Sequence, residues 1–409
     1  MKALFEAAQA RCRKAFERIE DIELQNTQKV LDAFRDHQVA QRHFAPTTGY
    51  GYDDVGRDTL ESIFASLFGA EAAIVRPQIA SGTHALALCL FGLLRPGDGL
   101  VYATGAPYDT LEDVIGVHEA TPGSLREMGV SYAQVPMKDG KIDVPGVMAM
   151  VTPNTRVVAV QRSRGYDLRP SLLPGDVEPL AKALHEACPD AYLMVDNCYG
   201  EFVCLDEPTH YGADVCVGSL IKNPGGGLAP TGGYAVGRRE AIERIAARLT
   251  APGIGREVGS YAASYQPFYQ GLFMAPHTVA QALKTGVLAA AVCGELGLRS
   301  TPGLNDLRSD IIQALELGTP ERLVCFCEGI QLASPVDSMA LPEPWDMPGY
   351  QHQVIMAAGT FVSGASIELS ADAPMRKPYA AYLQGGLSFA HGKLALMSAF
   401  ERMRARGLL

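Results

Sequence analysis

Two spacings of apolar side chains divide the chain into regions with different predicted structures. Up to about residue 40, apolar residues recur every three or four positions, and the same spacing returns near residue 60 after a glycine-rich loop. This spacing places apolar side chains on one face of a helix. We therefore predict helices in both regions, with inward faces formed by Leu4, Phe5, Ala8, Phe16, Ile19, Leu31 and Phe34, and then by Leu60, Ile63, Phe64, Leu67 and Phe68.

Short apolar runs then alternate with helix-length segments such as THALALCLFGLL. Runs that are apolar on both faces are typical of a parallel sheet covered by helices on both sides. Right-handed crossovers bring the C-terminal ends of such strands to one edge, where ligands bind. The predicted strands are AAIV (72–75), LVYAT (100–104), RVVAVQ (156–161), YLMVD (192–196), DVCVGS (214–219) and GGYAVG (232–237).

The pattern of the residues after the last predicted strand indicates a second structural unit. A long helical stretch, APHTVAQALKTGVLAAAVCGELG, precedes mixed short segments and a last helix, GKLALMSAFERMRARG. A length of 409 residues also suits more than one domain. We predict N-terminal helices and a loop (1–58), a large α/β domain (59–265) and a smaller C-terminal α+β domain (266–409).

Composition narrows the range of partners and compartments. The net charge of −10 gives no general electrostatic reason to bind nucleic acid or an anionic membrane surface. The amphipathic, charged N-terminus does not resemble a signal peptide, and no apolar run reaches the roughly 18 residues that span a bilayer. Nine cysteines, mostly within apolar stretches, predict reduced thiols in a cytoplasmic protein.

One cysteine pair could suggest a metal site. Cys325 and Cys327 are separated by one residue in VCFCEG, so on a strand they would share a face. A second ligand pair with zinc spacing does not follow them. We therefore interpret both as core thiols and expect no metal.

The segment SGTHALAL, which begins at Ser81, predicts an anion site. An apolar segment ends here, Ser81, Gly82 and Thr83 form a turn, and a buried helix begins. Free N–H groups and the positive end of the helix dipole attract anions at a helix start. The two hydroxyls add donors, and the glycine lets an oxyanion approach the backbone. The alternative is an ordinary serine N-cap beside a glycine.

Asp196 stands directly after the four mostly apolar residues YLMV of a predicted strand and should lie at the ligand edge of the sheet. A carboxylate in such a place needs a positive partner. A pyridinium N–H would be one, and a protonated pyridine ring is an electron sink. The alternative is an aspartate that caps the next turn.

Lys222 follows another apolar strand, three residues after Ser219 and shortly before three glycines. If it is buried, its amine would have a lowered pKa and could form an imine with an aldehyde. A Walker phosphate loop is excluded because Lys222 precedes the glycines. The alternative is a lysine on the surface.

Tyr108 lies just beyond the strand LVYAT, on the same expected edge. Its ring could stack on a flat cofactor and its hydroxyl could act as an acid, although a core tyrosine would have the same pattern. Together with Ser81, Asp196 and Lys222, it would supply contacts to a ring face, a phosphate, a ring nitrogen and an aldehyde. We therefore predict pyridoxal 5′-phosphate (PLP), bound to Lys222 as a Schiff base.

Several longer motifs give the chain a family resemblance over nearly its whole length. They are GYGYDDVGRDTLE, QRSRGYDLRPSL, VDNCYGEF, GSLIKNPGGGLAPTGGY, RLTAPGIGREVG, EPWDMPGYQHQVIMAAGTFVSGASIELSADAPMR and YLQGGL. The chain resembles fold-type-I PLP enzymes of the cystathionine and methionine lyase superfamily, and more closely the methionine γ-lyase-like proteins labelled as aluminium-resistance proteins. The resemblance implies the PLP-dependent transferase fold, a carbon–sulfur lyase for sulfur-containing amino acids, and a homotetramer of dimers with shared active sites.

The resemblance also implies a residue pair that reaches the phosphate of a neighbouring subunit. We assign this role to Tyr52 and Arg57 in the loop before residue 59. The superfamily's Tyr-x-Arg spacing is missing, so Tyr50 is the alternative tyrosine. The alternative for Arg57 is an ion pair with Asp53 or Asp54 at the helix start.

An arginine of the C-terminal domain binds the substrate carboxylate in the enzymes that the chain resembles. Arg376 in SADAPMRKP is our first candidate, because a guanidinium group matches a carboxylate bidentately. Arg164 in QRSRGY is the second. An exposed loop arginine beside Lys377 is the alternative for Arg376.

The predicted reaction starts with removal of the Cα proton by Lys222, while Asp196 keeps the pyridinium protonated. A sulfur leaving group then departs, with Tyr108 as proton donor. Two alternatives stay open: another PLP reaction, such as that of an aminotransferase, aldolase or racemase, or a non-catalytic stress or aluminium-tolerance protein. The residues after Lys222, and Thr83 in place of the usual methionine, differ from the better-known lyases. The substrate pocket is therefore not predicted from the resemblance.

Overall fold

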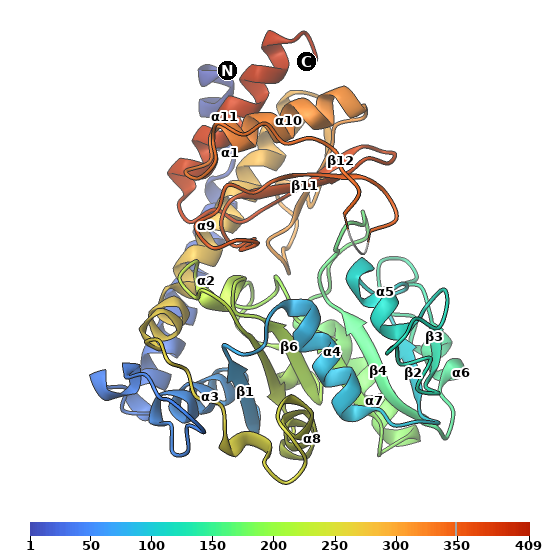
Figure 1. The fold of residues 1–409 in the computed structure, drawn as a ribbon. Coiled ribbons are helices and arrows are strands. Elements are labelled where there is room, and N and C mark those ends of the chain that lie inside the picture. The colour runs from blue at the N-terminus through green and yellow to red at the C-terminus, as the bar shows by residue number, and fades with distance from the viewer. Residues whose placement is uncertain (348–349) are drawn as a thin grey trace.

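The chain folds around two β-sheets in the computed structural model, which describes residues 1–347 and 350–409 (Figure 1). Residues 348 and 349, within the motif EPWDMPGYQHQV, lie outside the described residues. The helices are α1 (Lys2–Arg11), α2 (Arg13–Asp36), α3 (Val55–Leu67), α4 (Gly82–Leu93), α5 (Asp109–Ile115), α6 (Val144–Met150), α7 (Glu178–Ala187), α8 (Arg239–Leu249), α9 (Gln266–Glu295), α10 (Pro320–Leu332) and α11 (Phe389–Ala405).

The larger sheet has the strand order β1-β7-β6-β5-β4-β2-β3. All neighbouring strands are parallel except β7, which is antiparallel to both β1 and β6. The C-terminal ends of the other six strands therefore share one edge, as predicted. For the run GGYAVG (232–237) the prediction was wrong, because this strand runs in the opposite direction. The strands are β1 (Ala72–Arg76), β2 (Gly99–Tyr102), β3 (Ser131–Gln134), β4 (Thr155–Gln161), β5 (Tyr192–Asp196), β6 (Val215–Ser219) and β7 (Gly233–Gly237).

Helices cover both faces of this sheet, which confirms the sequence-based prediction. Alternate residues of β4 enter different cores: Val157 belongs to the core that contains Leu90 of α4 and Ile242 of α8, whereas Val158 belongs to the core that contains Leu180 of α7. Because successive side chains of a strand point to opposite faces, a strand that is apolar throughout is buried on both sides.

The smaller sheet is antiparallel throughout, in the order β10-β11-β12-β9-β8. Helices α10 and α11 pack beside it, and α9 runs along α2 from the large sheet towards the small one (Figure 1). Its strands are β8 (Arg299–Thr301), β9 (Gln313–Glu316), β10 (Val354–Ala357), β11 (Ser370–Pro374) and β12 (Ala380–Gln384). The predicted domain limits of 58/59 and 265/266 stay predictions, although α9 begins at Gln266.

One local prediction was wrong. Cys325 and Cys327 lie in helix α10 and not on a strand, so two positions apart they do not share a face. The helix begins where Thr319 caps the N–H of Arg322 and Pro320 occupies the first turn. Within the described part of the chain, no helix combines the length and the apolar character that crossing a membrane requires.

Candidate active site

The ends of β5 and β6 bring Asp196 and Lys222 into one site. The two strands are paired side by side, with Asp196 opposite Val217, and Lys222 follows the end of β6 after two residues. The Lys222 Nζ atom lies 4.0 Å from the centre of the Tyr199 ring. The amine and the Asp196 carboxylate are close enough for each to influence the pKa of the other.

The start of helix α4 lies against the same group. A methyl group on Gly82 would lie 3.4 Å from Ser219 Cβ, 3.7 Å from Cys198 Sγ and 3.9 Å from Lys222 Nζ. Ser81 is the N-cap, and its hydroxyl oxygen accepts the backbone N–H of His84 at 3.0 Å. The glycine turn, Ser219 and Lys222 are thus neighbours, as the sequence predicts, while their roles in binding stay predictions.

The hydroxyls around this helix start differ in whether they have partners. Thr83 Oγ1 is hydrogen-bonded to Thr110 Oγ1 at 2.7 Å, which links α4 to the first turn of α5. Ser219 Oγ is buried and finds no hydrogen-bond partner among the described residues. A buried hydroxyl without a partner is costly. An anion at the N-terminus of α4 would satisfy it, so the residues fit the phosphate group of PLP.

Asp196 combines both roles that its position predicts. Its Oδ1 accepts the backbone N–H of Cys198 at 3.1 Å, so it does cap the following turn. Burial raises the pKa of this carboxyl group, and Lys222 opposes the shift. A buried carboxylate at this edge, beside an amine, fits a protonated ring nitrogen.

The expected direction of the Lys222 pKa was wrong for the protein by itself. Burial lowers this pKa, but Cys198, Tyr199 and the Asp196 carboxylate outweigh burial and raise it. The prediction rested on burial alone, and the largest opposing contributions come from Cys198 and Tyr199. The free amine is therefore held as an ammonium group until its surroundings change.

Tyrosine side chains form the wall that faces the C-terminal domain. Tyr108 lies at the N-terminus of α5, with its hydroxyl 3.0 Å from that of Tyr350 and its ring centre 5.9 Å from that of Tyr166. Burial, with Tyr199 and Tyr350, raises the pKa of Tyr108 well above its ordinary value. The phenol therefore keeps its proton at neutral pH and can donate it.

A pocket of about 380 Å³ opens beside these tyrosines. Tyr108, Tyr166 and Tyr350 line it. Side chains of both charges line it as well: the acidic Asp109, Glu112 and Asp167, and the basic Arg164, Arg169 and Arg376. A wall of this kind suits a polar molecule that carries both charges.

The two arginines predicted to bind substrate both reach this pocket, but in different states. Arg376 is exposed, and its guanidinium donates to the Tyr166 carbonyl at 3.0 Å. Arg164 is buried, donates to the Thr301 carbonyl at 3.0 Å and lies 3.9 Å from Asp310. The exposed guanidinium is the freer of the two for a ligand.

Comparison with known proteins identifies the family. The methionine γ-lyase family model matches residues 1–404. This chain belongs to the methionine γ-lyase family. It is 52% identical over 393 residues to the uncharacterized protein YnbB of Bacillus subtilis strain 168, covering 96% of this chain and 93% of YnbB. The resemblance seen in the sequence motifs is confirmed.

Solved structures of similar proteins confirm the predicted fold class. A Listeria monocytogenes protein, described provisionally as a cystathionine β-lyase involved in aluminium resistance, has a TM-score of 0.95 and 46% identity, covering 98% of this chain and 100% of its own. A carbon–sulfur lyase involved in aluminium resistance from Clostridium novyi NT has a TM-score of 0.94 and 44% identity, covering 98% and 95%. The family implies PLP as cofactor.

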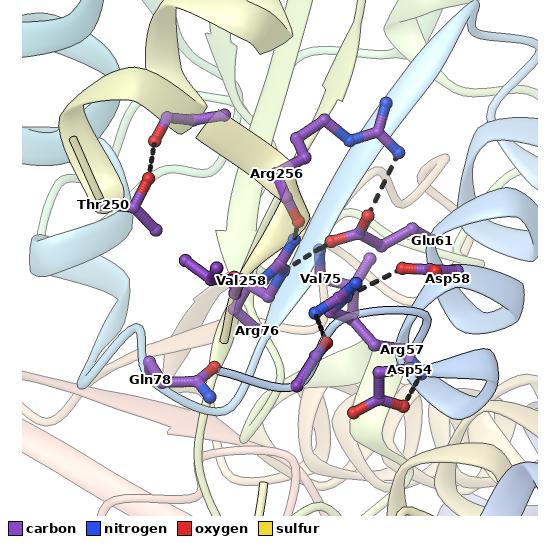
Figure 2. A network of polar contacts seen from close by, with 12 residues as sticks. Asp54, Arg57, Asp58, Glu61, Val75, Arg76, Gln78, Thr250, Arg256 and Val258 are labelled. Carbon is purple, nitrogen blue, oxygen red and sulfur yellow. Dashed lines mark hydrogen bonds and ion pairs between the residues drawn. The ribbon is translucent and has the colours of Figure 1, made fainter. Parts of the chain in front are cut away.

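In this methionine γ-lyase family chain, Arg57 lies in the first turn of α3 (Figure 2), so its predicted place in the loop before this helix was wrong. Arg57 is buried and donates to Asp58 at 2.7 Å and to the Gly51 carbonyl at 2.8 Å. The alternative ion pair with Asp53 or Asp54 was therefore wrong in its partner, because Asp54 instead accepts the backbone N–H of Arg57.

Two tyrosines of the same loop lie at the surface. Tyr50 and Tyr52 are 72% and 61% exposed, and their ring centres lie 5.6 Å apart. Exposed aromatic neighbours of this kind are common where another chain binds. The assignment of Tyr52, or Tyr50, and of Arg57 to the phosphate of a neighbouring subunit stays a prediction.

Several site residues were not predicted from the sequence. Tyr199, Tyr166, Tyr350 and Asp372 surround the site, and Tyr166 donates to Asp372 at 2.9 Å. Tyr199 has a positive φ of 73°, a conformation that is rare for tyrosine, and this strain directly after the Asp196 strand is seen in the structure alone. The described residues hold no group of three or more His, Cys, Asp or Glu side chains placed to bind a metal ion.

Proposed function

We propose that the protein is a PLP-dependent carbon–sulfur lyase that acts on a sulfur-containing amino acid. One observation carries the proposal: an amine, a buried carboxylate and the Ser219 hydroxyl, which has no partner among the described residues, meet beside the start of α4 at one edge of the sheet. Membership of the methionine γ-lyase family supports the same conclusion.

The residues that would hold PLP follow from their chemistry. Lys222 would bind the aldehyde carbon, and Asp196 would pair with the protonated ring nitrogen. Ser219, with the N-terminus of α4 at Gly82, would hold the phosphate. When bound, PLP supplies an electron sink that weakens the bonds of the substrate Cα atom.

The protein's own side chains would then move two protons. The Lys222 amine, released in its neutral form when the substrate amine replaces it on the aldehyde carbon, would accept the proton from the substrate Cα atom. The Tyr108 phenol, which keeps its proton at neutral pH, would protonate the departing sulfur. Tyr166 and Tyr350, which line the pocket beside Tyr108, would limit access of water to the reacting atoms.

The charged pocket favours one class of sulfur substrate. Methionine would release methanethiol, which is apolar and has no charged group to pair with the carboxylates and guanidinium groups that line this pocket. A cystathionine-type thioether releases a thiol that carries its own ammonium and carboxylate groups. Asp109 and Glu112 could pair with the ammonium group, and Arg376, which lines the same pocket, could pair with the carboxylate. We therefore propose a cystathionine-type substrate rather than methionine.

We also propose that the protein assembles as a homotetramer built from dimers, with Tyr52 and Arg57 of one subunit at the phosphate of the next. The exposed Tyr50 and Tyr52 support a protein contact at this loop. Light scattering gives the subunit number. Mixing a Lys222→Ala protein with an Arg57→Ala protein would restore activity if sites are shared, and would restore none if each chain acts alone.

Borohydride reduction of the PLP-loaded protein, followed by peptide mass mapping, tests the cofactor and its attachment point. We expect the added mass on the peptide that contains Lys222 and none in a Lys222→Ala variant. A purified protein that takes up no PLP and stays colourless would contradict the proposal and favour a non-catalytic role.

Product analysis then tests the reaction. With cystathionine we expect thiol, keto acid and ammonia in equal amounts, and a lower rate with methionine. Whether the keto acid is pyruvate or 2-oxobutyrate distinguishes β from γ elimination. An absolute need for a second keto acid would instead indicate an aminotransferase.

A further inference from the structure

A strap from the C-terminal domain reaches the large domain beside the pocket. It comprises the described residues 345–347 and 350–354. Trp345 and Val354, the first residue of β10, exchange two backbone hydrogen bonds, of 3.2 and 3.1 Å, so the two ends of the strap are paired beside the small sheet. Beyond this base, Tyr350 and Gln351 extend to α5. The strap therefore presents side chains to a helix that is about 240 residues away in the sequence.

Two contacts fix the strap on α5. The hydroxyl of Tyr350 lies 3.0 Å from that of Tyr108. Gln351 donates from Nε2 to the Glu112 carboxylate at 3.2 Å, one helical turn beyond Tyr108. Tyr350 and Gln351 both line the pocket with the residues that they contact. The contacts thus hold Tyr350 at the rim where the proposed substrate would enter.

A buried phenol that gives up its proton needs a hydrogen-bond donor. When Tyr108 protonates a leaving group, it becomes a phenolate, and an unpaired charge in such surroundings is costly. Within the described part of the chain, the hydroxyls of Tyr166 and Tyr199 make hydrogen bonds elsewhere: Tyr166 donates to Asp372 and Tyr199 accepts from Ser366. The Tyr350 hydroxyl is at hydrogen-bonding distance from the Tyr108 oxygen.

We propose that Tyr350 is a positioning residue that makes Tyr108 an effective acid. In the protein by itself either hydroxyl of the pair can be the donor. Once Tyr108 has given up its proton, the Tyr350 hydroxyl donates to the Tyr108 oxygen and stabilises the phenolate that remains. The inference rests on the proposed lyase function, in which Tyr108 protonates the departing sulfur. It adds a residue from the C-terminal strap to a proton transfer that the large domain would otherwise perform alone.

The proton transfers balance within the protein. The Cα–H bond breaks, its proton passes to Lys222, and its electron pair becomes the new carbon–carbon double bond. The carbon–sulfur bond breaks with its electron pair on sulfur. The O–H bond of Tyr108 breaks and an S–H bond forms. The proton held by Lys222 then replaces the one that Tyr108 lost, and neither residue is changed at the end.

The test compares two substrates that differ in their need for an acid. Cystathionine releases a thiolate that must be protonated, whereas β-chloroalanine releases chloride, which needs no proton. For Tyr350→Phe we expect kcat on cystathionine to fall about 10- to 100-fold, with KM changed less, because general acid catalysis contributes on this scale. The rate with β-chloroalanine should stay within about twofold of the wild type.

Two further variants sharpen the comparison. Tyr132→Phe also removes one phenolic hydroxyl, but from an exposed contact with Gln134 on the edge strand β3, and it should leave both substrates unaffected. A Tyr108→Phe, Tyr350→Phe double variant should be no slower on cystathionine than Tyr108→Phe alone, because Tyr350 acts through Tyr108. The PLP absorbance spectrum and the melting temperature of Tyr350→Phe should match the wild type.

The possible outcomes distinguish a failure of the role inferred for Tyr350 from a failure of the proposed lyase function. A Tyr350→Phe protein that is as fast as the wild type on cystathionine would overturn the inference and leave the lyase intact. Equal losses on both substrates, or a lowered melting temperature, would show a structural role for Tyr350 and would also overturn it. A wild-type protein that binds PLP but eliminates from neither substrate would overturn the proposed function itself.

Discussion

Tyr166 of the large domain donates a hydrogen bond to Asp372 of the small domain over 2.9 Å. The carboxyl group also accepts from Gln384 at 2.7 Å, and Lys222 is close enough to influence its pKa. Burial raises this pKa from 3.8 to about 6. The two domains therefore meet beside Lys222 through an acid that changes charge in a mildly acidic range.

This raised pKa predicts how stability depends on pH. Because the folded protein favours the protonated acid, the contribution of Asp372 is complete below pH 4 and is lost as the pH rises through 6. Asp372→Asn imitates the protonated form. We expect the wild type to lose about 3 kcal/mol of unfolding free energy relative to this variant between pH 4 and 7. Urea unfolding across this range measures the difference.

The control for this measurement is Asp21→Asn, because Asp21 is exposed on α2. Its unfolding free energy should follow that of the wild type across the same pH range. A constant offset between Asp372→Asn and the wild type, independent of pH, would contradict the raised pKa.

Ser219→Ala should not destabilise the PLP-free protein, but it should weaken the binding of PLP. Without PLP, the variant loses a buried hydroxyl that has no partner among the described residues, so its melting temperature should be equal to or higher than that of the wild type. With PLP, it loses a donor to a phosphate, and the dissociation constant should rise about 10-fold. Fluorescence titration with PLP gives this constant. A lower melting temperature of the cofactor-free variant with unchanged PLP affinity would contradict the assignment.

Glu61 is the centre of the polar network in Figure 2. Its two oxygens accept from Arg76 at 2.6 Å and from Arg256 at 3.1 Å, and it is 1% exposed. Glu61→Gln would leave buried guanidinium charge without its counterion. We expect about 3 to 5 kcal/mol of lost unfolding free energy, measured with urea.

The matched control is Glu243→Gln. Glu243 also pairs with Arg256, at 3.6 Å, but half of its side chain is exposed to solvent. Its loss should cost less than about 1 kcal/mol. Equal effects of the two substitutions would show that burial does not determine the strength of this network.

The strands of the large sheet could be predicted because burial on both faces leaves an uninterrupted apolar run. β3, with the sequence SYAQ, could not be predicted, since it is an edge strand with exposed polar ends. β11 was also missed. It contains Asp372 as a buried residue, and the partners that permit this burial, Tyr166 and Gln384, are distant in sequence or on another strand.

The site could be predicted where position on a strand determined it. Asp196 and Lys222 follow strand ends, so the sheet topology alone brings them together. Tyr199 and Tyr350 reach the site through a strained turn and a strap, which depend on tertiary contacts. The pKa of Lys222 shows the same limit, because burial and the closeness of Asp196 could be predicted, whereas the contributions of Cys198 and Tyr199 could not.

Replacing Arg376 or Arg164 by methionine, which keeps much of the side-chain volume, should distinguish the roles of the two arginines. Arg376 is exposed at the pocket, so Arg376→Met should raise KM for cystathionine about 10- to 100-fold through loss of a charge-assisted carboxylate contact. Its melting temperature should stay unchanged. Arg164 is buried against Asp310, and Arg164→Met should cost about 3 kcal/mol of unfolding free energy.

Steady-state kinetics and urea unfolding on both variants decide between the two arginines. A substrate-binding role for Arg376 requires the KM effect without the stability effect, because its guanidinium contacts the protein through one carbonyl of Tyr166. The opposite pattern, with KM raised in Arg164→Met alone, would assign the carboxylate to Arg164. It would also mean that Asp310 releases this guanidinium when substrate binds, since the two groups lie 3.9 Å apart in the protein by itself.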